Sequence, residues 1–378
     1  MNKKLVIGMV GGGENAFIGN VHRIAMRIDG RYELNAACLS STPERALRSA
    51  QQLGIADERS YANYQEMAKS ESIRSDGIRA VVIVTPNHLH YPVALCFLQA
   101  GIHVICDKPL CISSAQANHL SEVAQQTGKL LVVTYNYCAY PMVREARERI
   151  ANGELGQLRS LQVEYSQDWL ANNVEASGQK QASWRTDPTQ AGAAGCLGDI
   201  GVHAYNLLHF VSGMPAQQVA AELTSFVAGR RLDDHAQVLL RYANGARGSV
   251  LASQILQGKE NHLRFYISGE LGSLEWCQEN PDQLILAMAD QATCILKRGR
   301  AKLSPASAEV SLLPGGHPEG YLEAFSMLYK EIADVLLEVR AHDSIQDARR
   351  AGHDMHFIEA CLASAQQDSR WTKLTGLV

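Results

Sequence analysis

A glycine cluster directly after the first apolar run most constrains the fold of this chain. Residues 5–22 read LVIGMVGGGENAFIGNVH, with glycines at 11–13, another glycine at 19, and a helical pattern after it. Glycines permit a tight turn and let the backbone approach a pyrophosphate, while a helix N-terminus presents N–H groups to that anion. The stretch therefore predicts the strand, turn and helix that open a dinucleotide-binding fold.

The spacing departs from the usual G-x-G-x-x-G pattern. Gly11 and Gly13 fit it, but the third glycine is displaced to Gly19, so the loop is longer than standard. A glycine cluster after a strand is also typical of an ordinary turn. The next strands and helices of the chain therefore decide between the two interpretations.

Alternating strands and helices occupy the first third of the chain. The runs rich in Val and Ile predict strands buried on both faces, which is typical of a parallel sheet. We expect strands at 32–40, 79–84, 102–106 and 130–134, and helices at 43–53, 92–100 and 113–128. The alternation predicts a doubly wound parallel sheet in a domain over residues 1–135.

The pattern changes after this domain. We expect a helix at 141–151, mostly strands from 157 to about 297, one helix at about 199–211, an irregular loop at 299–317, and closing helices at 320–337 and 344–365. Residues 136–378 therefore predict a mostly antiparallel α+β domain, whose sheet could offer a face for substrate or for another subunit. We expect the closing helices, 320–365, to pack back on the first domain.

Composition excludes several classes of protein. The 378 residues suit two domains, and a net charge of -4 argues against a nucleic-acid or acidic-membrane binder. No apolar run reaches the length of a membrane span, and the N-terminal residues lack a signal-peptide cleavage site. The nine cysteines are scattered without a C-x-x-C pair, which indicates reduced thiols in a cytoplasmic protein rather than disulfides or zinc ligands.

Three motifs fall at the carboxyl ends of the predicted strands, where ligands bind in such sheets. They are the glycine loop, Thr85-Pro86-Asn87-His88 and Asp107-Lys108-Pro109. Lys108 comes directly after a buried strand, beside an acid and fixed by a proline, so it is expected to lie over the cofactor cleft. There it could hydrogen-bond a substrate oxygen and stabilise charge during hydride transfer. The alternative is a solvated loop lysine.

A fourth motif, GCLGDIGVHAYNLLHF at 195–210, carries a candidate acid–base pair. Asp199 and His203 are four residues apart and so share one face of a helix. Histidine titrates near neutral pH and a carboxylate can orient it, so the pair can move a proton. An ordinary helix-surface contact is the alternative. No third ligand stands at a suitable spacing, so no metal is expected.

Taken in order, the glycine loop, T-P-N-x-x-H, D-K-P and G-D-I-G-V-H resemble the Gfo/Idh/MocA family of oxidoreductases over nearly the whole chain. The resemblance implies an N-terminal Rossmann domain and a C-terminal α+β domain with a large, mostly antiparallel open sheet for substrate binding and oligomerisation. A further implication is a homodimer or homotetramer that packs through that sheet. It also implies a nicotinamide cofactor. The cofactor-binding residues would include Gly11, Gly13, Thr85, Asn87, His90, Asp107 and Lys108.

The resemblance also implies the catalytic roles. Lys108 falls on the family's E-K-P lysine, with Asp107 in place of the usual Glu, and would position and polarise the reacting hydroxyl. His203 would be the general acid and base, and Asp199 would bind the substrate or tune the histidine. Asn206 stands where the family often has a further Asp, so that carboxylate is missing.

Four further residues are candidate substrate contacts. Trp184 and Arg185 match a W-R of similar proteins, Tyr137 comes after a strand where many relatives carry Arg, and His317 precedes a closing helix. The alternatives are a core Trp184, a surface ion pair at Arg185, and a helix cap at His317.

Coenzyme preference is predicted from the end of the second strand, where NAD-binding proteins usually carry an acid. Ser40 stands there, with Arg45 five residues on. The missing acid permits NADP, but no basic residue stands directly after the strand to bind a 2′-phosphate. We therefore expect NAD, with NADP open.

The expected function is hydride transfer between a nicotinamide and a ring carbon of a sugar, inositol or related polyol. One alternative is an NAD-dependent glycoside hydrolase that cleaves its substrate through transient oxidation of the sugar and elimination. Its substrate could be a modified glycoside such as a sulfo-sugar glycoside. A second alternative is a non-catalytic, dinucleotide-sensing regulator. The retention of Lys108 and His203 argues against a regulator.

Overall fold

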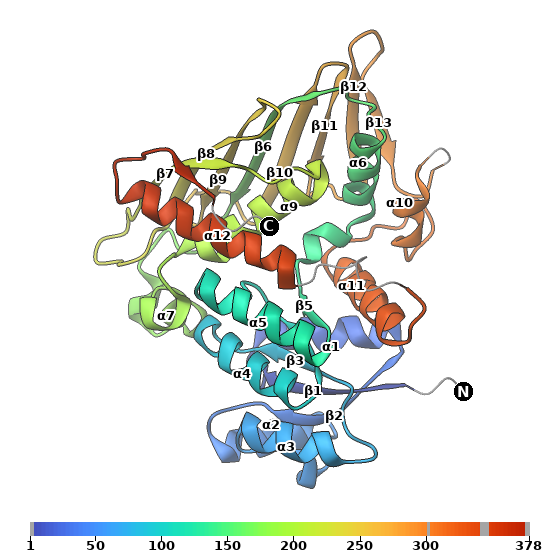
Figure 1. The fold of residues 1–378 in the computed structure, drawn as a ribbon, viewed down its shortest axis with the longest axis vertical. Coiled ribbons are helices and arrows are strands. Elements are labelled where there is room, and N and C mark those ends of the chain that lie inside the picture. The colour runs from blue at the N-terminus through green and yellow to red at the C-terminus, as the bar shows by residue number, and fades with distance from the viewer. Residues whose placement is uncertain (1–3, 301–302, 341–347, 375–378) are drawn as a thin grey trace. The chain divides into compact units, whose positions relative to one another are not determined.

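The structure is a computed structural model, and it describes residues 4–300, 303–340 and 348–374 (Figure 1). The chain divides into two compact units. The first takes Met1–Thr134 and Phe325–Met355, and the second takes Tyr135–Ala324 and His356–Val378. Each unit contains one of the two sheets.

The first unit is built on a parallel sheet with the strand order β2-β1-β3-β4-β5. All five residues of the central strand β3 are buried, as expected for a strand covered on both faces. The predicted doubly wound sheet is thus confirmed. Its strands are β1 Leu5–Gly11, β2 Tyr32–Cys38, β3 Ala80–Val84, β4 His103–Cys106 and β5 Leu131–Val133.

Helices connect these strands, and α4 and α5 pack side by side (Figure 1). The predicted N-cap Ser113 accepts a hydrogen bond from the Gln116 N–H, and Gly128 ends the same helix in the left-handed conformation. The helices are α1 Phe17–Asp29, α2 Pro43–Gln52, α3 Tyr64–Ile73, α4 Asn87–Gln99 and α5 Ser114–Thr127, with a short 3-10 turn at Asp57–Arg59.

The prediction of a helix over 92–100 was wrong in its start. Helix α4 begins at Asn87 and carries Pro92 in its interior. A proline lacks the N–H that would bond four residues back, but near a helix start that loss removes only one bond. Consequently Asn87, His88 and His90 lie on a helix rather than in a loop.

The second unit contains a nine-stranded sheet with the order β13-β12-β11-β10-β6-β9-β8-β7-β14. Its neighbouring strands are antiparallel except for the pair β6 and β9, which is parallel. The predicted mostly antiparallel sheet is thus confirmed. The strands are β6 Leu158–Ser166, β7 Gln218–Thr224, β8 His235–Arg241, β9 Arg247–Ser253, β10 His262–Gly269, β11 Gly272–Cys277, β12 Gln283–Met288, β13 Cys294–Lys297 and β14 Thr372–Lys373.

One face of this sheet is covered by helices. In β10, Leu263, Phe265 and Ile267 are fully buried, whereas Arg264 and Tyr266 between them are exposed. The buried side packs against α9, which also contacts β6 and β9 (Figure 1). Before residue 320 the helices of this unit are α6 Pro141–Ala151, α7 Lys180–Arg185, α8 Pro188–Ala191, a π-helical turn at Leu197–Gly201, α9 Val202–Ser212 and α10 Pro305–Glu309, with 3-10 turns at Asn136–Ala139 and Val174–Ser177.

The last third of the chain corrects one expectation. Residues 299–317 contain the short helix α10, which starts at Pro305 with Ser304 as its side-chain cap. The closing helices are α11 Tyr321–Leu336 and α12 Ala348–Ala365. Residues 344–347 of the predicted second closing helix lie outside the described residues.

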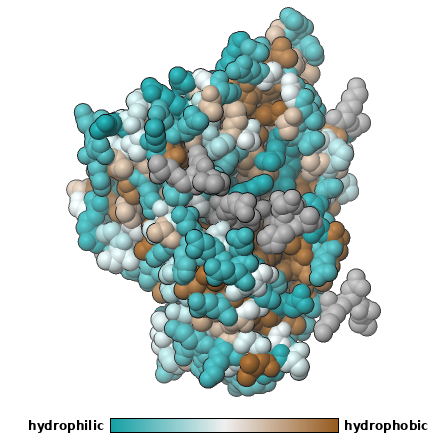
Figure 2. Space-filling view, viewed as in Figure 1, coloured by the Kyte–Doolittle hydropathy of each residue, from teal (hydrophilic) through white to brown (hydrophobic). Residues whose placement is uncertain are grey.

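Hydrophobic side chains on the surface lie in separate small groups among hydrophilic ones on the face shown in Figure 2. Within the described residues, no helix combines the length and the apolar character that crossing a membrane requires.

Candidate active site

The glycine loop after β1 is packed too closely for side chains. Gly11 and Gly12 adopt left-handed backbone angles, with φ of 82° and 74°. A Cβ on Gly11 would lie 2.8 Å from the Val84 carbonyl oxygen, and one on Gly19 would lie 2.5 Å from the Gly12 Cα. Gly19 therefore brings helix α1 against the loop, and its partner there is Gly12, which the motif spacing does not single out.

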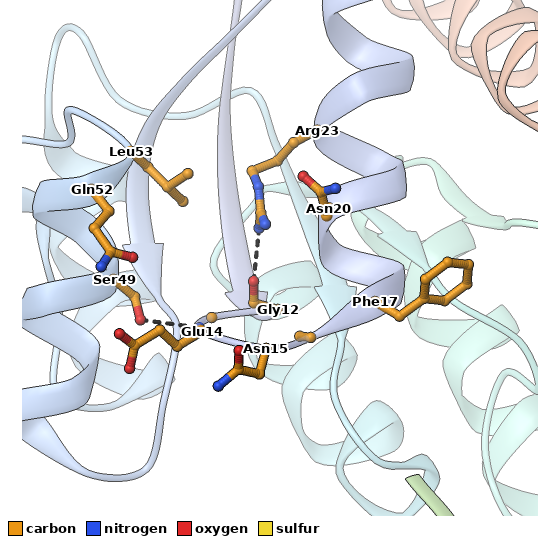
Figure 3. A pocket seen from close by; sticks show the side chains of 11 residues that line it. Gly12, Glu14, Asn15, Phe17, Asn20, Arg23, Ser49, Gln52 and Leu53 are labelled. Carbon is orange, nitrogen blue, oxygen red and sulfur yellow. Dashed lines mark hydrogen bonds between the residues drawn. The ribbon is translucent and has the colours of Figure 1, made fainter. Parts of the chain in front are cut away.

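A pocket of about 540 Å³ adjoins this loop, between α1 and α2 (Figure 3). Arg23 reaches across to donate to the Gly12 carbonyl at 2.7 Å, and the Ser49 hydroxyl accepts from the Glu14 N–H at 3.2 Å. Helix α1 begins with no side-chain cap and no acidic residue in its first turn. This leaves the helix start suited to an anion. The pocket is lined by Gly12, Gly13, Glu14, Asn15, Ala16, Phe17, Asn20, Arg23, Ser49, Gln52 and Leu53.

The turn after β3 carries three predicted cofactor contacts. The Thr85 hydroxyl is buried with no hydrogen-bond partner among the described residues, so it can take a bond from a ligand. Asn87 is buried at the start of α4. His90 is only 1% exposed, and its Nδ1 and Nε2 lie 2.7 Å and 2.8 Å from the carbonyl oxygens of Pro109 and Thr85. A direct cofactor contact by His90 would break one of these bonds.

The Asp107-Lys108-Pro109 turn comes after β4 and is held by its own carboxylate. Asp107 Oδ1 accepts from the Lys108 N–H and from the Thr134 hydroxyl, each at 2.9 Å. The Asp107 N–H donates to the Ile83 carbonyl, and the Lys108–Pro109 peptide bond is cis. The acid thus fixes the backbone of the turn. Lys108 itself is half-buried.

Ser40 and Arg45 lie beyond the end of β2, as predicted. The Ser40 hydroxyl accepts from the Thr42 N–H at 3.2 Å, and Arg45 is exposed on α2. A nearby acid is instead supplied by Glu14 of the glycine loop, which pairs with Arg48 at 3.4 Å. The contacts proposed for Ser40 and Arg45 remain predictions.

His203 lies in the second unit, among aromatic rings at the start of α9. Tyr137 meets it edge to face at 5.0 Å between ring centroids, and Tyr135 does so at 5.7 Å. Tyr165 lies 6.2 Å away. The imidazole is 8% exposed, so these rings shield it from most of the solvent.

Asp199 lies on the π-helical turn directly before α9. Its Oδ2 accepts from Gln254 Nε2 at 2.9 Å and from Arg185 Nε at 3.2 Å. The predicted helix over 199–211 is therefore preceded by a wider turn that carries the acid, as π-turns at functional sites often do. Asp199 and His203 lie one turn apart, as predicted.

The start of this turn is held by Asp233, which was not predicted from the sequence. Its carboxylate accepts from the Gly195 and Leu197 N–H groups at 2.6 Å and 2.8 Å. Burial raises the pKa of Asp233, and these hydrogen bonds oppose the rise. A Cβ on Gly195 would lie 2.1 Å from the Asp233 carbonyl oxygen, which explains the glycine.

Tyr137 begins a chain of side-chain hydrogen bonds. Asn261 Oδ1 can only accept, so the Tyr165 hydroxyl donates to it at 2.8 Å and the Tyr137 hydroxyl donates to Tyr165 at 2.6 Å. Gln167 Nε2 also donates to Asn261 at 2.8 Å. Burial raises the pKa of both tyrosines, which keeps the two hydroxyls protonated.

The chain continues to Asp199 through Gln254, whose Nε2 lies 3.4 Å from Gln167 Oε1. Gln167 lies directly after β6, Gln254 directly after β9 and Asn261 directly before β10, and these strands are adjacent and in register. None of the three was predicted. The signal that could have found them is the row of amides at the ends of predicted strands.

Two other predicted contacts have different settings. The Arg185 guanidinium stacks on the Trp184 ring at 4.2 Å while it also binds Asp199. His317 is exposed, and its main-chain carbonyl accepts from Arg298. No described contact links His317 to the chain that ends at Asp199, so its role remains a prediction.

One group of metal-ligand types occurs among the described residues. His262, Cys277 and Glu279 bring one ligand atom each within 4.8 Å of one another. His262 Nδ1 and the Glu279 carboxylate lie 2.5 Å apart, which accounts for their proximity as a hydrogen-bonded pair. Glu279 is exposed.

Family models match both parts of the chain. Residues 5–135 match the oxidoreductase family with an NAD-binding Rossmann fold, and residues 143–275 match the GFO/IDH/MocA C-terminal domain.

Relatives match almost the full length. An oxidoreductase structure from Sinorhizobium meliloti is 44% identical, with 98% of this chain and 100% of that chain covered and a TM-score of 0.90. An inositol dehydrogenase homologue complexed with NAD+ from Azotobacter vinelandii is 32% identical, with 99% and 98% covered and a TM-score of 0.92. Levoglucosan dehydrogenase of Pseudarthrobacter phenanthrenivorans is 30% identical over 77% of this chain and 78% of that protein. The chain therefore belongs to the Gfo/Idh/MocA family of oxidoreductases, with an NAD-binding Rossmann domain at its N-terminal end.

Proposed function

We propose that this protein is a dehydrogenase that transfers a hydride between NAD and a ring carbon of an inositol, a sugar or a related polyol. The observation that carries the proposal is the Asp199–His203 pair on one face of a helix start. Asp199 is held by Arg185 and Gln254, and His203 lies among tyrosine rings. The relatives include an inositol dehydrogenase homologue and a levoglucosan dehydrogenase, which supports a cyclic polyol or sugar.

The first unit fits the dinucleotide. Gly11, Gly12 and Gly19 leave no room for side chains, so a pyrophosphate could approach the backbone there. The buried Thr85 hydroxyl has a free hydrogen-bonding capacity within the described residues. When bound, the nicotinamide supplies the carbon that accepts or donates the hydride.

The side chains of this protein would handle the substrate oxygen. His203 would accept the hydroxyl proton at an imidazole nitrogen as the substrate is oxidised, and would return it in the reverse direction. Lys108 would donate a hydrogen bond to the same oxygen and stabilise its developing negative charge. Asp199 would orient the substrate or the imidazole, with its own carboxylate fixed by two donors.

The test is a screen of the purified protein with NAD and with NADP against inositols, sugars, sugar acids and glycosides, including sulfo-sugar glycosides. Formation of reduced cofactor supports the proposal. In that assay Lys108→Ala should lower kcat by about 100-fold or more, because transition-state stabilisation is lost. Binding of NAD should largely survive. Lys129→Ala, at a lysine of the same unit just after α5, is the matched control and should keep the wild-type kcat.

Other outcomes would identify the alternatives. Release of an aglycone without net reduced cofactor would indicate the redox-neutral glycoside hydrolase. Binding of NAD without turnover of any substrate in the panel would favour a dinucleotide-sensing regulator. Either result would contradict the proposed dehydrogenase.

We also propose a homodimer or homotetramer through the open face of the nine-stranded sheet. Exposed apolar side chains on its strands support this, and they include Leu239, Tyr266, Ile285 and Ile295. Sedimentation of the wild type and of Leu239→Lys tests it, since a charge in an apolar interface should shift the protein toward monomer. A cytoplasmic location is proposed because none of the nine cysteines forms a disulfide.

A further inference from the structure

His90 joins two loops of the first unit at the carboxyl ends of neighbouring strands. Strands β3 and β4 pair in register as far as Ile83 and Cys106, and the Asp107 N–H donates to the Ile83 carbonyl just beyond them. Beyond this hydrogen bond the two segments are no longer paired as strands. The His90 ring then spans them, with Nε2 at the Thr85 carbonyl and Nδ1 at the Pro109 carbonyl.

Each nitrogen of the His90 ring faces one of these two carbonyl oxygens. Both partners are carbonyl oxygens, which only accept, and a neutral imidazole carries one N–H while an imidazolium carries two. The ring therefore donates to one carbonyl when neutral and to both when charged. Burial lowers the pKa of His90, while the bond to Pro109 and the Asp107 carboxylate oppose that effect. In either state both ring nitrogens face carbonyl oxygens of this protein, at 2.7 Å and 2.8 Å.

The two loops carry different parts of the candidate site. Thr85 belongs to the turn that packs on the glycine loop, where a Cβ on Gly11 would lie 3.0 Å from the Thr85 methyl group. Pro109 comes directly after Lys108. Thr85 directly follows β3, whereas the contacts that hold the lysine turn include those of Asp107 and of His90.

We propose that His90 is a positioning residue for Lys108: its buried ring lies in contact with both the Pro109 and the Thr85 carbonyls, donates to at least one of them, and so sets the lysine turn at a fixed place relative to the cofactor-binding turn. This rests on the proposed function, in which Lys108 acts on the substrate oxygen. It assigns His90 no contact with the cofactor. Loss of the bridge would displace the lysine turn more than the better supported Thr85.

The test compares His90→Leu and His90→Gln with a matched control. Leucine removes both nitrogen–carbonyl contacts at similar volume, and glutamine keeps a hydrogen-bond donor. His119→Gln is the control, because His119 is exposed on α5 in the same unit and its ring also makes a hydrogen bond, 2.8 Å from the Tyr91 hydroxyl.

The expected result is a split between turnover and binding. His90→Leu should lower kcat about 10- to 100-fold, because a displacement of a catalytic group by about 1 Å costs this much. The dissociation constant of NAD, measured by fluorescence titration, should change less than about threefold. His90→Gln should recover part of kcat, and His119→Gln should match the wild type.

A second readout needs no activity. Competitive acetylation of the free protein, read by peptide mass spectrometry, reports the reactivity of the Lys108 amine relative to Lys129. The ratio should change in His90→Leu and stay unchanged in His119→Gln, because only the first variant releases the lysine turn.

Three results would overturn the inference. An unchanged labelling ratio with much weaker NAD binding would make His90 a cofactor contact. A lower melting temperature with kcat and the labelling ratio unchanged would make it only a fold-stabilising residue. If the wild type turns over no substrate and His90→Leu has the labelling ratio of the wild type, both this inference and the proposed function fail. If the wild type turns over no substrate but the ratio changes in His90→Leu, the proposed function alone fails.

Discussion

Acid should destabilise this protein through one buried histidine of the first unit. His22 lies on α1 with no exposed surface, and burial lowers its pKa from 6.5 to about 4. Its Nδ1 lies 2.7 Å from the Tyr329 hydroxyl, and its ring meets Phe325 edge to face. Its Nε2 has no hydrogen-bond partner among the described residues, so a proton added there gains no hydrogen bond, and the Asp107 carboxylate offsets only part of the effect of burial.

The sign and the magnitude of this effect come from linkage. The pKa is lower in the folded state, so the unfolded chain takes up the proton first as the pH falls through about 6.5. Stability from the neutral ring is present above that pH and is lost progressively down to the folded pKa of about 4. At about 1.4 kcal/mol for each pKa unit, the full loss is roughly 3 kcal/mol. Between pH 7 and pH 5 it is about 2 kcal/mol.

The assay is urea denaturation of the wild type and of His22→Asn at pH 7 and pH 5. Asparagine can still hydrogen-bond near the Nδ1 position but cannot be protonated in this range, and any packing loss is the same at both pH values. The drop in the free energy of unfolding should therefore be about 2 kcal/mol larger in the wild type.

His119→Asn is the control, because this exposed histidine should leave the wild-type drop in place. Equal drops in the wild type and in His22→Asn would refute the reasoning. So would a nuclear magnetic resonance titration in which the His22 ring of the folded protein gains its proton near pH 6.5.

Three further perturbations test other parts of the structure. Gly19→Ala places a Cβ 2.5 Å from the Gly12 Cα, so NAD binding should weaken about tenfold or more in a fluorescence titration, and an unchanged affinity would contradict the close approach. Arg230→Met removes the buried cation that donates to Asp234 at 3.0 Å and should cost about 3 to 5 kcal/mol in urea denaturation; a loss below about 1 kcal/mol would be inconsistent with this role. Asp199→Asn should lower kcat about 100-fold with NAD binding retained, and wild-type turnover in this variant would remove Asp199 from the mechanism.

The sequence predicted the first unit well because its signals are local. The run at 79–84 is apolar and β-branched and can be buried on both faces, which leaves few alternatives to a central parallel strand. The start of α4 was less predictable, because a proline such as Pro92 usually lies at a helix end. Here the hydrogen bonds of the surrounding turns override that preference. The displaced Gly19 was recognised, but its partner Gly12 is evident only from the packing.

The candidate site of the second unit was predicted only in part, for a related reason. Asp199 and His203 share a motif and could be found together. Their supporting residues Asp233, Gln254 and Asn261 lie just outside the ends of other strands, and the register of the sheet brings Gln254 and Asn261 to the same edge. A single neutral amide is not marked by any local motif, so only the row of amides at the strand ends could have pointed to Gln254 and Asn261.

The parallel pair of β6 and β9 has a consequence for how the second unit assembles. Strands β7 to β9 and β10 to β13 are two runs of sequence neighbours joined by short connections, so each can form early from nearby segments. Strand β6 precedes both in the chain but lies between them in the sheet. Its two sheet partners, β9 and β10, both follow it in the chain, so the strand that carries Tyr165 completes its pairing only after they have formed. A nascent chain would thus complete its hydroxyl and amide relay only after Asn261, directly before β10, has been synthesised.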